Sequence, residues 1–540
     1  MLKKIGFSAI VLSSLFQVKA QEKPKLVVGL VIDQMRWDYL HRFENKFQKG
    51  GFKRLLNQGF SLNNVMINYV PSVTALGHTS VYTGSVPSIH GIAGNNWLDP
   101  KTGKGVYCTT DTSVKGIGSS SERVGAHSPR NLWSTTITDQ LGMATNFQSK
   151  VVGVSLKDRA SILPAGHHPT GAFWFDGKTG NFVTSSYYMD KLPKWLNTFN
   201  AQKRGAKLVK NGWSTLLPIE EYTESTADNQ PWEGLLGSAK TPTFPYTHLA
   251  EDYAKKKKII KQTPFGNTLT LELADTVVDA YQMGQDEITD FLAINLASTD
   301  YVGHLTGVNS IEVEDTYLRL DRDLASFFKS LDKKVGKGNY LVFVTADHGA
   351  AHAVGYMKEH QMPTGFFDKD LKDELKTALR TKFGTDDLIA GVMNYQVYLN
   401  KKTITQRGLD MNEVKTFIID FLKDWDTILY AVDLQKVSES SIPEPIKTKI
   451  INGYNWKRSG DIQVIAKDGM LPSYAKKGTT HSVWNSYDAH IPLIFMGTGI
   501  QQGESSKAHY ITDIAPTLAQ LLQIENPSGT VGQPIIEVVD

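Results

Sequence analysis

Cysteine is almost absent from this chain, because Cys108 is the only one among 540 residues. A single thiol excludes an intramolecular disulfide and any metal site built from several cysteines. Stability must therefore come from a hydrophobic core, which a chain of this length with 41% hydrophobic residues can form. Length alone permits either several domains or one elaborated α/β domain.

An excess of charge of one sign is also absent. Lys and Arg total 58 against 55 Asp and Glu, and three of the lysines lie within residues 1–20. The remainder of the chain is balanced, so composition gives no reason to expect nucleic acid or an anionic membrane as a partner. The sequence contains no internal repeat and no low-complexity tract.

Long hydrophobic runs are confined to the N-terminus. Residues 1–20 combine early lysines, an apolar stretch and Val18-Lys19-Ala20 as a small-residue cleavage site, the pattern of a secretory signal peptide. No later window reaches the ~18 to 20 apolar residues that a membrane span needs. We expect cleavage near Ala20 and a periplasmic or secreted protein, with a membrane-tethered N-terminus as the less favoured alternative.

Metal-binding residue types follow several apolar runs. Runs rich in β-branched residues predict buried strands at residues 26–32, 151–156, 291–297 and 340–346. Carboxylates and imidazoles follow three of these strands, namely Asp33, Asp300 with His304, and Asp347 with His348. Ligands bind at the carboxyl ends of strands in open α/β sheets, and this pairing of donors suits a divalent transition metal. The ordinary alternatives are a helix N-cap for Asp33, a core histidine for His304, and a loop start for Asp347.

A candidate nucleophile lies at the start of a helix. Helical spacing over residues 75–82, with Pro71 before it and Gly84 after it, places Thr74 at or near the helix N-terminus. There the helix dipole favours an alkoxide and a bound phosphoryl group, although an ordinary Thr N-cap is at least as common. Asn95, in the loop that follows, is a donor to an anion or simply a turn residue.

Two cations follow the strand at residues 151–156. Lys157 and Arg159 offer a point charge and a planar fork, which together suit a tetrahedral oxyanion. The alternative is a surface salt-bridge cluster with Asp158.

The remaining pattern predicts an α/β fold. A helix over residues 310–331, with Ser310 as its N-cap, connects two of the strands and supports a right-handed parallel crossover. Further helices are expected from residue 37, over 267–283 and after Thr512, and strands over 61–69 and 491–496. Segments at about 160–265 and 355–475 are interpreted as insertions, the first capping the sheet. The second should contain helices around 371–383 and 412–423 and strands at 394–399 and 461–466.

A further imidazole, His481, follows the second insertion. With it, six candidate ligands could hold two metal ions, namely Asp33, Asp300, His304, Asp347, His348 and His481. Two metals roughly 3.5 to 4 Å apart stabilise both the attacking and the leaving oxygen in phosphoryl displacement. Imidazole and carboxylate without thiolate favour zinc, although another divalent ion is compatible.

The chain resembles the alkaline phosphatase superfamily, and closely the secreted, phosphate-irrepressible alkaline phosphatases of the PafA type. The resemblance covers nearly the whole mature chain, including VVGLVIDQMRWDYL, NYVPSVTALGHTSVYTGSVPSIHGIAGN, VVGVSLKDRASILPAGHHPTGAFWF, NLASTDYVGH, TADHGAAH and KKGTTHSVWNSYDAHIPL. It implies one catalytic domain over residues 21–540, with a central, mostly parallel sheet flanked by helices and capping insertions.

The resemblance also implies roles for individual residues. One zinc ion would be held by Asp300, His304 and His481, and a second by Asp33, Asp347 and His348 with Thr74. Thr74 would be the nucleophile that forms a phosphothreonine, while Asn95, Lys157 and Arg159 hold the nonbridging phosphate oxygens. The implied protein is a monomeric phosphate monoesterase of broad specificity that acts on small molecules.

Three other functions are compatible with parts of the pattern. Sulfatases are disfavoured because they need Cys or Ser in a C/S-x-P-x-R setting, whereas Cys108 lies in VYCTTDT. Nucleotide pyrophosphatase/phosphodiesterases share the threonine, asparagine and metal ligands but lack the Lys157 and Arg159 pair. The third possibility is a catalytically inactive, metal-bearing binding protein, against which the retained Thr74 argues.

Overall fold

The computed structural model describes residues 23–539 of the chain. The expected signal peptide and its cleavage site lie outside the described residues. Among residues 23–539, no helix is both long and apolar enough to cross a membrane.

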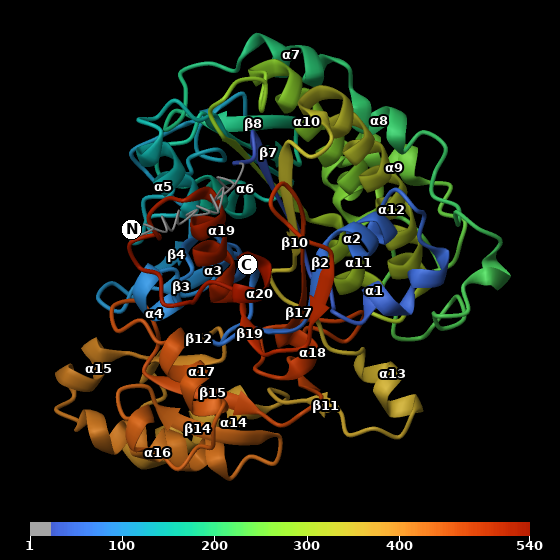
Figure 1. Ribbon diagram of the computed structural model, residues 1–540. Helices are drawn as coiled ribbons and strands as arrows, with labels where there is room; N and C mark the ends of the chain where they lie inside the picture. The colour runs from blue at the N-terminus through green and yellow to red at the C-terminus, as the bar shows by residue number, and fades with distance from the viewer. Residues whose placement is uncertain (1–22, 540) are drawn as a thin grey trace, which may run out of the picture.

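A large mixed sheet forms the centre of the fold, and its middle is parallel (Figure 1). β1 lies between β10 and β9, and β6 and β7 follow beyond β9, each pair running parallel. The bounds are Leu26–Ile32 for β1, Tyr340–Thr345 for β10, Asp290–Leu296 for β9, Val151–Ser155 for β6 and Gly171–Asp176 for β7. Every residue of these five strands is buried, which explains their largely apolar sequences.

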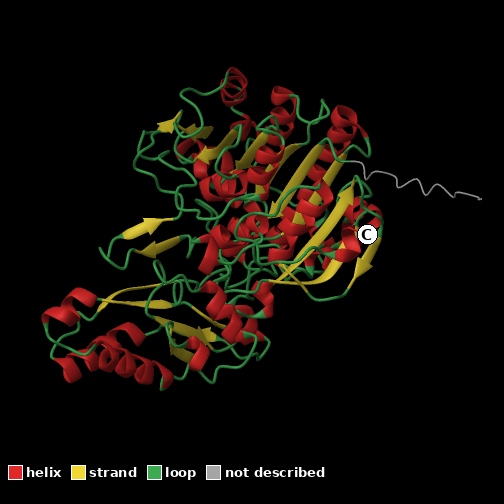
Figure 2. Cartoon of the chain, turned by 60° about the vertical axis from the view of Figure 1, so that its left-hand side comes forward, coloured by secondary structure: helices red, strands yellow, loops and turns green. Residues whose placement is uncertain are grey.

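One antiparallel strand borders the parallel centre on each side of the sheet, whose strands are yellow in Figure 2. β17 (His490–Gly497) pairs antiparallel with β10 and with β2 (Phe60–Met66), and β8 (Asn181–Ser185) pairs antiparallel with β7. The expected α/β sheet flanked by helices is therefore confirmed, with a parallel centre bordered by β17 on one side and by β8 on the other, both of opposite direction. The segment 160–265 adds β7 and β8 to the sheet, as well as helices and loops outside it.

Helices cover both faces of the sheet (Figure 1). One layer contains α3 (Thr74–Thr83), α6 (Asp158–Ala165) and α19 (Ile514–Leu522), and the other contains α10 (Phe265–Tyr281) and α12 (Ile311–Leu331). As expected, the Ser310 hydroxyl caps α12 by accepting the Val313 backbone N–H at 3.2 Å.

Two expected elements are shorter than the sequence suggested. The helix predicted from residue 37 is the single turn α1 (Tyr39–Arg42), and the strand predicted to residue 69 ends at Met66. The Ile67 backbone N–H still donates to the Ala489 carbonyl, one residue before β17, so pairing with that segment continues only one residue past the end of β2.

The segment 355–475 contains a separate lobe, the orange region at the bottom of Figure 1, which we call the subdomain. Its four-stranded sheet has the order β12, β13, β15, β14, with bounds Ile389–Met393, Gln396–Leu399, Ile462–Ala466 and Ile428–Asp433. α14 (Leu371–Phe383) and α16 (Met411–Lys423) pack on this sheet around a hydrophobic core distinct from the central one. The helices and strands expected in this segment are thus present.

Candidate active site

The polar residues that follow the central strands meet at one edge of the sheet. Asp33 directly follows β1, Asp347 and His348 lie just after β10, and Asp300 lies on α11 (Ser298–Thr306), which begins soon after β9. Because these three strands are neighbours and parallel, their carboxyl ends bring the side chains together. Asp33 caps no helix, so the N-cap alternative is wrong.

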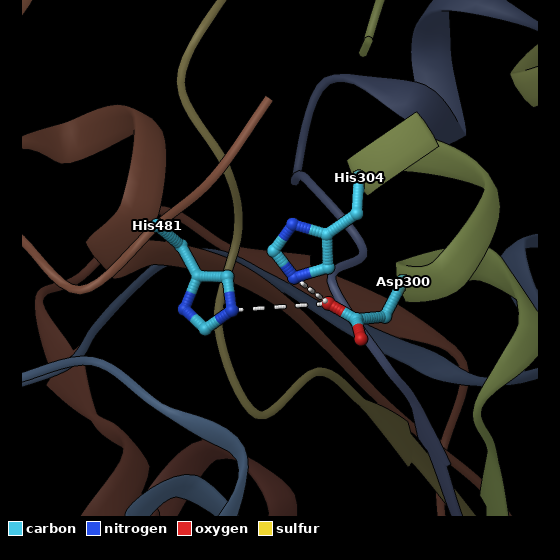
Figure 3. Close-up of side chains that lie close together, drawn as sticks. All are labelled: Asp300, His304 and His481. Carbon is cyan, nitrogen blue, oxygen red and sulfur yellow. Dashed lines mark ion pairs between the residues drawn. The ribbon is translucent and has the colours of Figure 1, made fainter. Parts of the chain in front are cut away.

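Asp300, His304 and His481 form the first group with metal-ligand geometry (Figure 3). The Asp300 Oδ1 atom lies 3.1 Å from His304 Nε2 and 3.8 Å from His481 Nε2. Asp300 and His304 are four residues apart on α11, so their side chains lie on the same helix face. His481 reaches the group from the loop before β17.

Asp33, Asp300 and His348 form a second group of this kind, so Asp300 belongs to both. His348 Nε2 lies 3.7 Å from Asp33 Oδ1 and 3.4 Å from Asp347 Oδ2. The ring of His348 stacks on that of His481 with centroids 3.6 Å apart, so the two groups adjoin. Six of the seven expected metal-binding side chains therefore lie within one polar cluster, and the exception is Thr74.

The three histidines share one orientation. Because a carbonyl oxygen only accepts, each Nδ1 must carry the proton and donate to the backbone. The Nδ1 atoms of His304, His348 and His481 lie 2.8, 2.9 and 2.7 Å from the carbonyl oxygens of Thr479, Gly349 and Ser72. This arrangement directs every Nε2 atom toward the carboxylates. Hydrogen bonds from the other ring nitrogen orient histidine ligands in metal sites in the same way.

The residues fit divalent metal ions by a second observation. Asp33 Oδ1, Asp347 Oδ2 and His348 Nε2 are buried and have no hydrogen-bond partner within the protein. Leaving buried polar atoms without a partner is unfavourable, and these three atoms are of the types that bind metal ions. The donor set of imidazole and carboxylate is one that divalent transition metals prefer.

Buried charges in the cluster set the protonation of its ligands. Burial disfavours the Asp300 carboxylate, but His304 and Lys157 outweigh burial and hold the pKa of Asp300 well below its usual range. Burial, followed by the neighbouring His348, lowers the pKa of His481 well below its usual value. An ionised carboxylate and a neutral imidazole are the forms that bind metal.

Thr74 is the first residue of α3, and its hydroxyl does not cap the helix. The N-cap is Val73, so the alternative of an ordinary Thr cap is wrong. The Thr74 Oγ1 atom instead lies 3.3 Å from Lys157 Nζ and 3.4 Å from Arg159 Nη2. Gly77 lets α3 approach the metal-ligand cluster, because a Cβ there would lie 2.3 Å from the Asp347 carbonyl oxygen.

Lys157 forms ion pairs with two carboxylates of the cluster. Its Nζ atom lies 2.8 Å from Asp33 Oδ2 and 2.7 Å from Asp300 Oδ2. The side chain is only 3% exposed, so the alternative of a surface salt-bridge cluster is wrong for Lys157. A buried lysine between two carboxylates and a hydroxyl is placed to hold a phosphoryl oxygen beside all three.

Asn95 lies in the loop between α4 (Pro87–His90) and β3 (Asn96–Leu98). Its Oδ1 atom accepts the backbone N–H of Ala75, 2.9 Å away at the start of α3. Because the oxygen is engaged there, the amide NH2 group is the part that can donate to an anion next to Thr74.

Gln34 and Tyr107 are among the residues of the site that sequence reasoning missed. The Gln34 amide donates to Asp300 Oδ1 at 2.8 Å, and the Tyr107 hydroxyl accepts from Arg159 Nη1 at 3.2 Å while donating to Asp158 at 2.5 Å. Only the position of Gln34 directly after Asp33 could have drawn attention to it. Tyr107 lies on a separate hairpin 52 residues earlier in the chain, so no local sequence pattern predicts its contact with Arg159.

Comparison with known proteins identifies the relatives of this chain. Residues 27–489 match the family model described as type I phosphodiesterase / nucleotide pyrophosphatase. Alkaline phosphatase PafA of Elizabethkingia meningoseptica is 66% identical over 97% of this chain and 96% of its own length. A protein of Myroides odoratus named calcium-transporting ATPase is 50% identical over 99% and 97%, and alkaline phosphatase PhoV of Synechococcus elongatus is 50% identical over 96% and 93%.

Solved structures of the first relative match the fold over nearly the whole chain. The crystal structure of wild-type PafA superposes with a TM-score of 0.95 and covers 96% of this chain and 100% of its own. A PafA variant with one threonine, one asparagine, one lysine and one arginine substituted gives a TM-score of 0.94 at 65% identity, with the same coverage.

Proposed function

Because this chain belongs to the type I phosphodiesterase / nucleotide pyrophosphatase family, and with it to the alkaline phosphatase superfamily, we propose that it hydrolyses phosphate monoesters through a phosphothreonine on Thr74. One observation carries the mechanism. The Thr74 hydroxyl lies at a helix N-terminus within 3.4 Å of two cationic side chains, beside a buried cluster of carboxylates and imidazoles.

The metal groups support a site for two zinc ions. We assign one ion to Asp300, His304 and His481, and the other to Asp33, Asp347 and His348 with Thr74. When bound, such ions lower the pKa of a hydroxyl and neutralise charge on the attacking and leaving oxygens. The bridging position of Asp300 between the two groups supports their acting as one centre.

The residues of the chain then perform the transfer. The Thr74 oxygen attacks phosphorus as its proton departs, the bond to the ester oxygen breaks, and the alcohol leaves after gaining a proton from water. Water next attacks the phosphothreonine, Thr74 recovers its proton, and inorganic phosphate is released. Asn95, Lys157 and Arg159 hold the nonbridging oxygens through both steps.

The family description refers to phosphodiesterases, which act on diesters. The pair of cations Lys157 and Arg159 favours monoesters instead. A monoester dianion has one more anionic oxygen than a diester, and Lys157 and Arg159 both lie next to the attacking atom. The four positions substituted in the PafA variant have the same residue types and the same intervals along the chain as Thr74, Asn95, Lys157 and Arg159, which supports treating these four residues as one functional set.

The name of the Myroides odoratus relative supports ATP as a second candidate substrate. The terminal phosphoryl group of ATP is also transferred as a dianion and would meet the same nucleophile and cations. ATP therefore belongs in the substrate set, along with the small phosphate monoesters that a monomeric, exported enzyme of broad specificity would meet.

The test compares an aryl phosphate monoester with the matching methyl aryl diester. In Lys157→Ala and Arg159→Ala, kcat/KM for the monoester should fall roughly ten- to a hundredfold, the effect of one charge-assisted hydrogen bond in the transition state. The double variant should lose less than the product of the single effects, because both cations hold one phosphoryl group. Diester hydrolysis should fall much less in all three.

Metal content must be measured in each variant, because Lys157 also contacts Asp33 and Asp300. Lys372→Ala, an exposed lysine on α14, is the matched control and should change neither substrate. Equal losses for the two substrates would assign the cations to structure or metal positioning and favour the phosphodiesterase alternative.

A further inference from the structure

The subdomain reaches the loop that holds Asn95. We define the Asn95 loop as residues 91–96, from the end of the short helix α4 to the first residue of strand β3. On its inner side the loop is fastened to α3 by Asn95 Oδ1, which accepts from Ala75. On its outer side the contacts come from the hairpin that joins β12 to β13.

Asn394, at the tip of that hairpin, bonds the loop on both sides of Asn95. Its Nδ2 atom donates to the Asn96 carbonyl oxygen at 2.8 Å and lies 3.5 Å from that of Ala93. A Cβ on Gly94 would come within 2.3 Å of the same nitrogen, so the close approach requires glycine there. One side-chain amide thus holds the backbone before and after the residue proposed to bind phosphate.

The hairpin tip is held in an unfavourable backbone conformation. Asn394 and Tyr395 have φ angles of 57° and 58°, and left-handed backbone is tolerated by Asn but disfavoured for a bulky residue such as Tyr. Packing maintains it, since the Tyr395 ring stacks on Phe367 with centroids 5.0 Å apart and its carbonyl accepts from Val464 at 2.8 Å. Strain of this kind persists where surrounding structure requires a defined geometry.

Arg458 of the subdomain fastens the start of the same loop. Its guanidinium donates to the Gly91 carbonyl and, at 2.6 Å, to that of Asn131. The charge also lies 4.2 Å from the ring centroid of Trp133 and 5.0 Å from that of Trp97, which follows the loop. The subdomain therefore contacts the Asn95 loop at its beginning, middle and end.

We propose that the subdomain positions Asn95 for phosphate binding, with Asn394 as the positioning residue that transmits its contact. The inference rests on the proposed function, in which Asn95 donates to a nonbridging oxygen. Asn394 itself touches no reacting atom. Its effect on turnover must therefore depend on the presence of the Asn95 side chain.

A double-mutant cycle tests this dependence. Asn394→Gly removes the amide and keeps the left-handed turn, which glycine adopts without strain. In the otherwise unchanged protein it should lower kcat/KM for an aryl phosphate about tenfold, because small displacements of a positioned group slow transfer by such factors. In the Asn95→Ala background the same substitution should change kcat/KM less than about twofold.

Two further variants separate donation from folding. Asn394→Asp accommodates the left-handed backbone but cannot donate to the two carbonyl oxygens, so it should behave as Asn394→Gly does. Asn400→Ala removes an N-cap of α15 (Lys401–Gln406), where Asn400 Oδ1 accepts from Thr403 at 3.2 Å. It should destabilise the subdomain in urea and leave kcat/KM unchanged.

The outcomes separate a failure of the Asn394 positioning role from a failure of the proposed function. If Asn95→Ala lowers kcat/KM and Asn394→Gly lowers it equally in both backgrounds, Asn394 acts by another route and the inference is overturned. The same conclusion follows if Asn394→Gly has no effect, or if Asn400→Ala reproduces its effect. An unchanged kcat/KM in Asn95→Ala would instead remove Asn95 from the proposed function, and the positioning role would fall with it.

Discussion

The side-chain amide of Gln34 donates to the Asp300 carboxylate, with Nε2 2.8 Å from Oδ1, the same oxygen that faces His304 and His481. Gln34 also has a φ of 63° and directs its backbone N–H at Asp347 Oδ1, 3.2 Å away. One residue in left-handed backbone thus orients carboxylates that follow two different strands.

Removing this amide should weaken metal binding. Gln34→Gly keeps the backbone N–H and suits the left-handed backbone, so its effect isolates the side chain. We expect metal affinity to fall roughly tenfold or more, as for other second-shell partners. Competition with a chelator, followed by measurement of protein-bound metal, reads out the change. Gln34→Ala should weaken binding equally, and if only the alanine variant does so, the backbone and not the amide is responsible.

Thr74→Ala should abolish formation of the phosphoenzyme and lower turnover roughly a thousandfold or more, as loss of a nucleophile does. Its metal content should stay near normal, since the carboxylate and imidazole ligands remain. Acid quenching with labelled substrate detects the phosphoenzyme, and Thr74→Ser should retain it. Wild-type turnover in the alanine variant would exclude Thr74 as the nucleophile.

Chelation should inactivate the protein, and added zinc should restore it. Removal of metal should also lower Tm, because a ligand that binds only the folded state stabilises it by mass action. Asp33 Oδ1, Asp347 Oδ2 and His348 Nε2 would be left without partners in the interior. Activity and calorimetry before and after verified removal measure both effects, and full activity without metal would contradict the two-ion site.

The buried carboxyl group of Glu312 should make the free energy of unfolding fall as pH rises. Burial raises the pKa of Glu312 from 4.5 to about 7, and burial together with Glu312 raises that of Glu233 to about 9. The folded state therefore keeps protons that the unfolded chain has released, so the free energy of unfolding decreases from pH 4.5 upward until these groups ionise.

Glu312→Gln cannot ionise and should lose less stability on that rise in pH. Relative to the wild type, it should gain about 1 to 3 kcal/mol between pH 4.5 and pH 9. Urea unfolding at both pH values measures this difference, and Glu525→Gln, an exposed substitution, is the control. An identical pH dependence in Glu312→Gln and the wild type would show that Glu312 is ionised in the folded protein.

Cys108 should not react with thiol reagents in the folded protein. The residue has no exposed surface, and burial raises the pKa of its thiol to about 12. At pH 8 the reactive thiolate is therefore scarce as well as inaccessible. Labelling should become stoichiometric only in denaturant, and rapid labelling of the native protein would contradict the buried position.

Sequence patterns predicted the centre of the fold because they are local there. Buried parallel strands give continuous apolar runs, and the residues just after them, such as Asp33 and Asp347, must share one sheet edge. Ser310 was predictable as a cap for the same reason, since the motif lies within a few residues of its helix.

Contacts made between distant segments were not predictable. The left-handed backbone of Gln34 depends on its surroundings, and the bond from Asn394 to the Asn95 loop joins segments about 300 residues apart. The pairing of β7 with β6 was missed likewise, because its sequence fits a hairpin in a capping segment as well as a strand in the main sheet.

The stacked rings of His348 and His481 have the whole subdomain between them in the chain. During synthesis, every other proposed metal ligand emerges from the ribosome before the subdomain does, and His481 emerges after it. A complete first metal group therefore requires a nearly full-length chain. Chains truncated within the subdomain would carry all three carboxylates and two of the three imidazoles, and would still lack His481, the last residue of the proposed metal site.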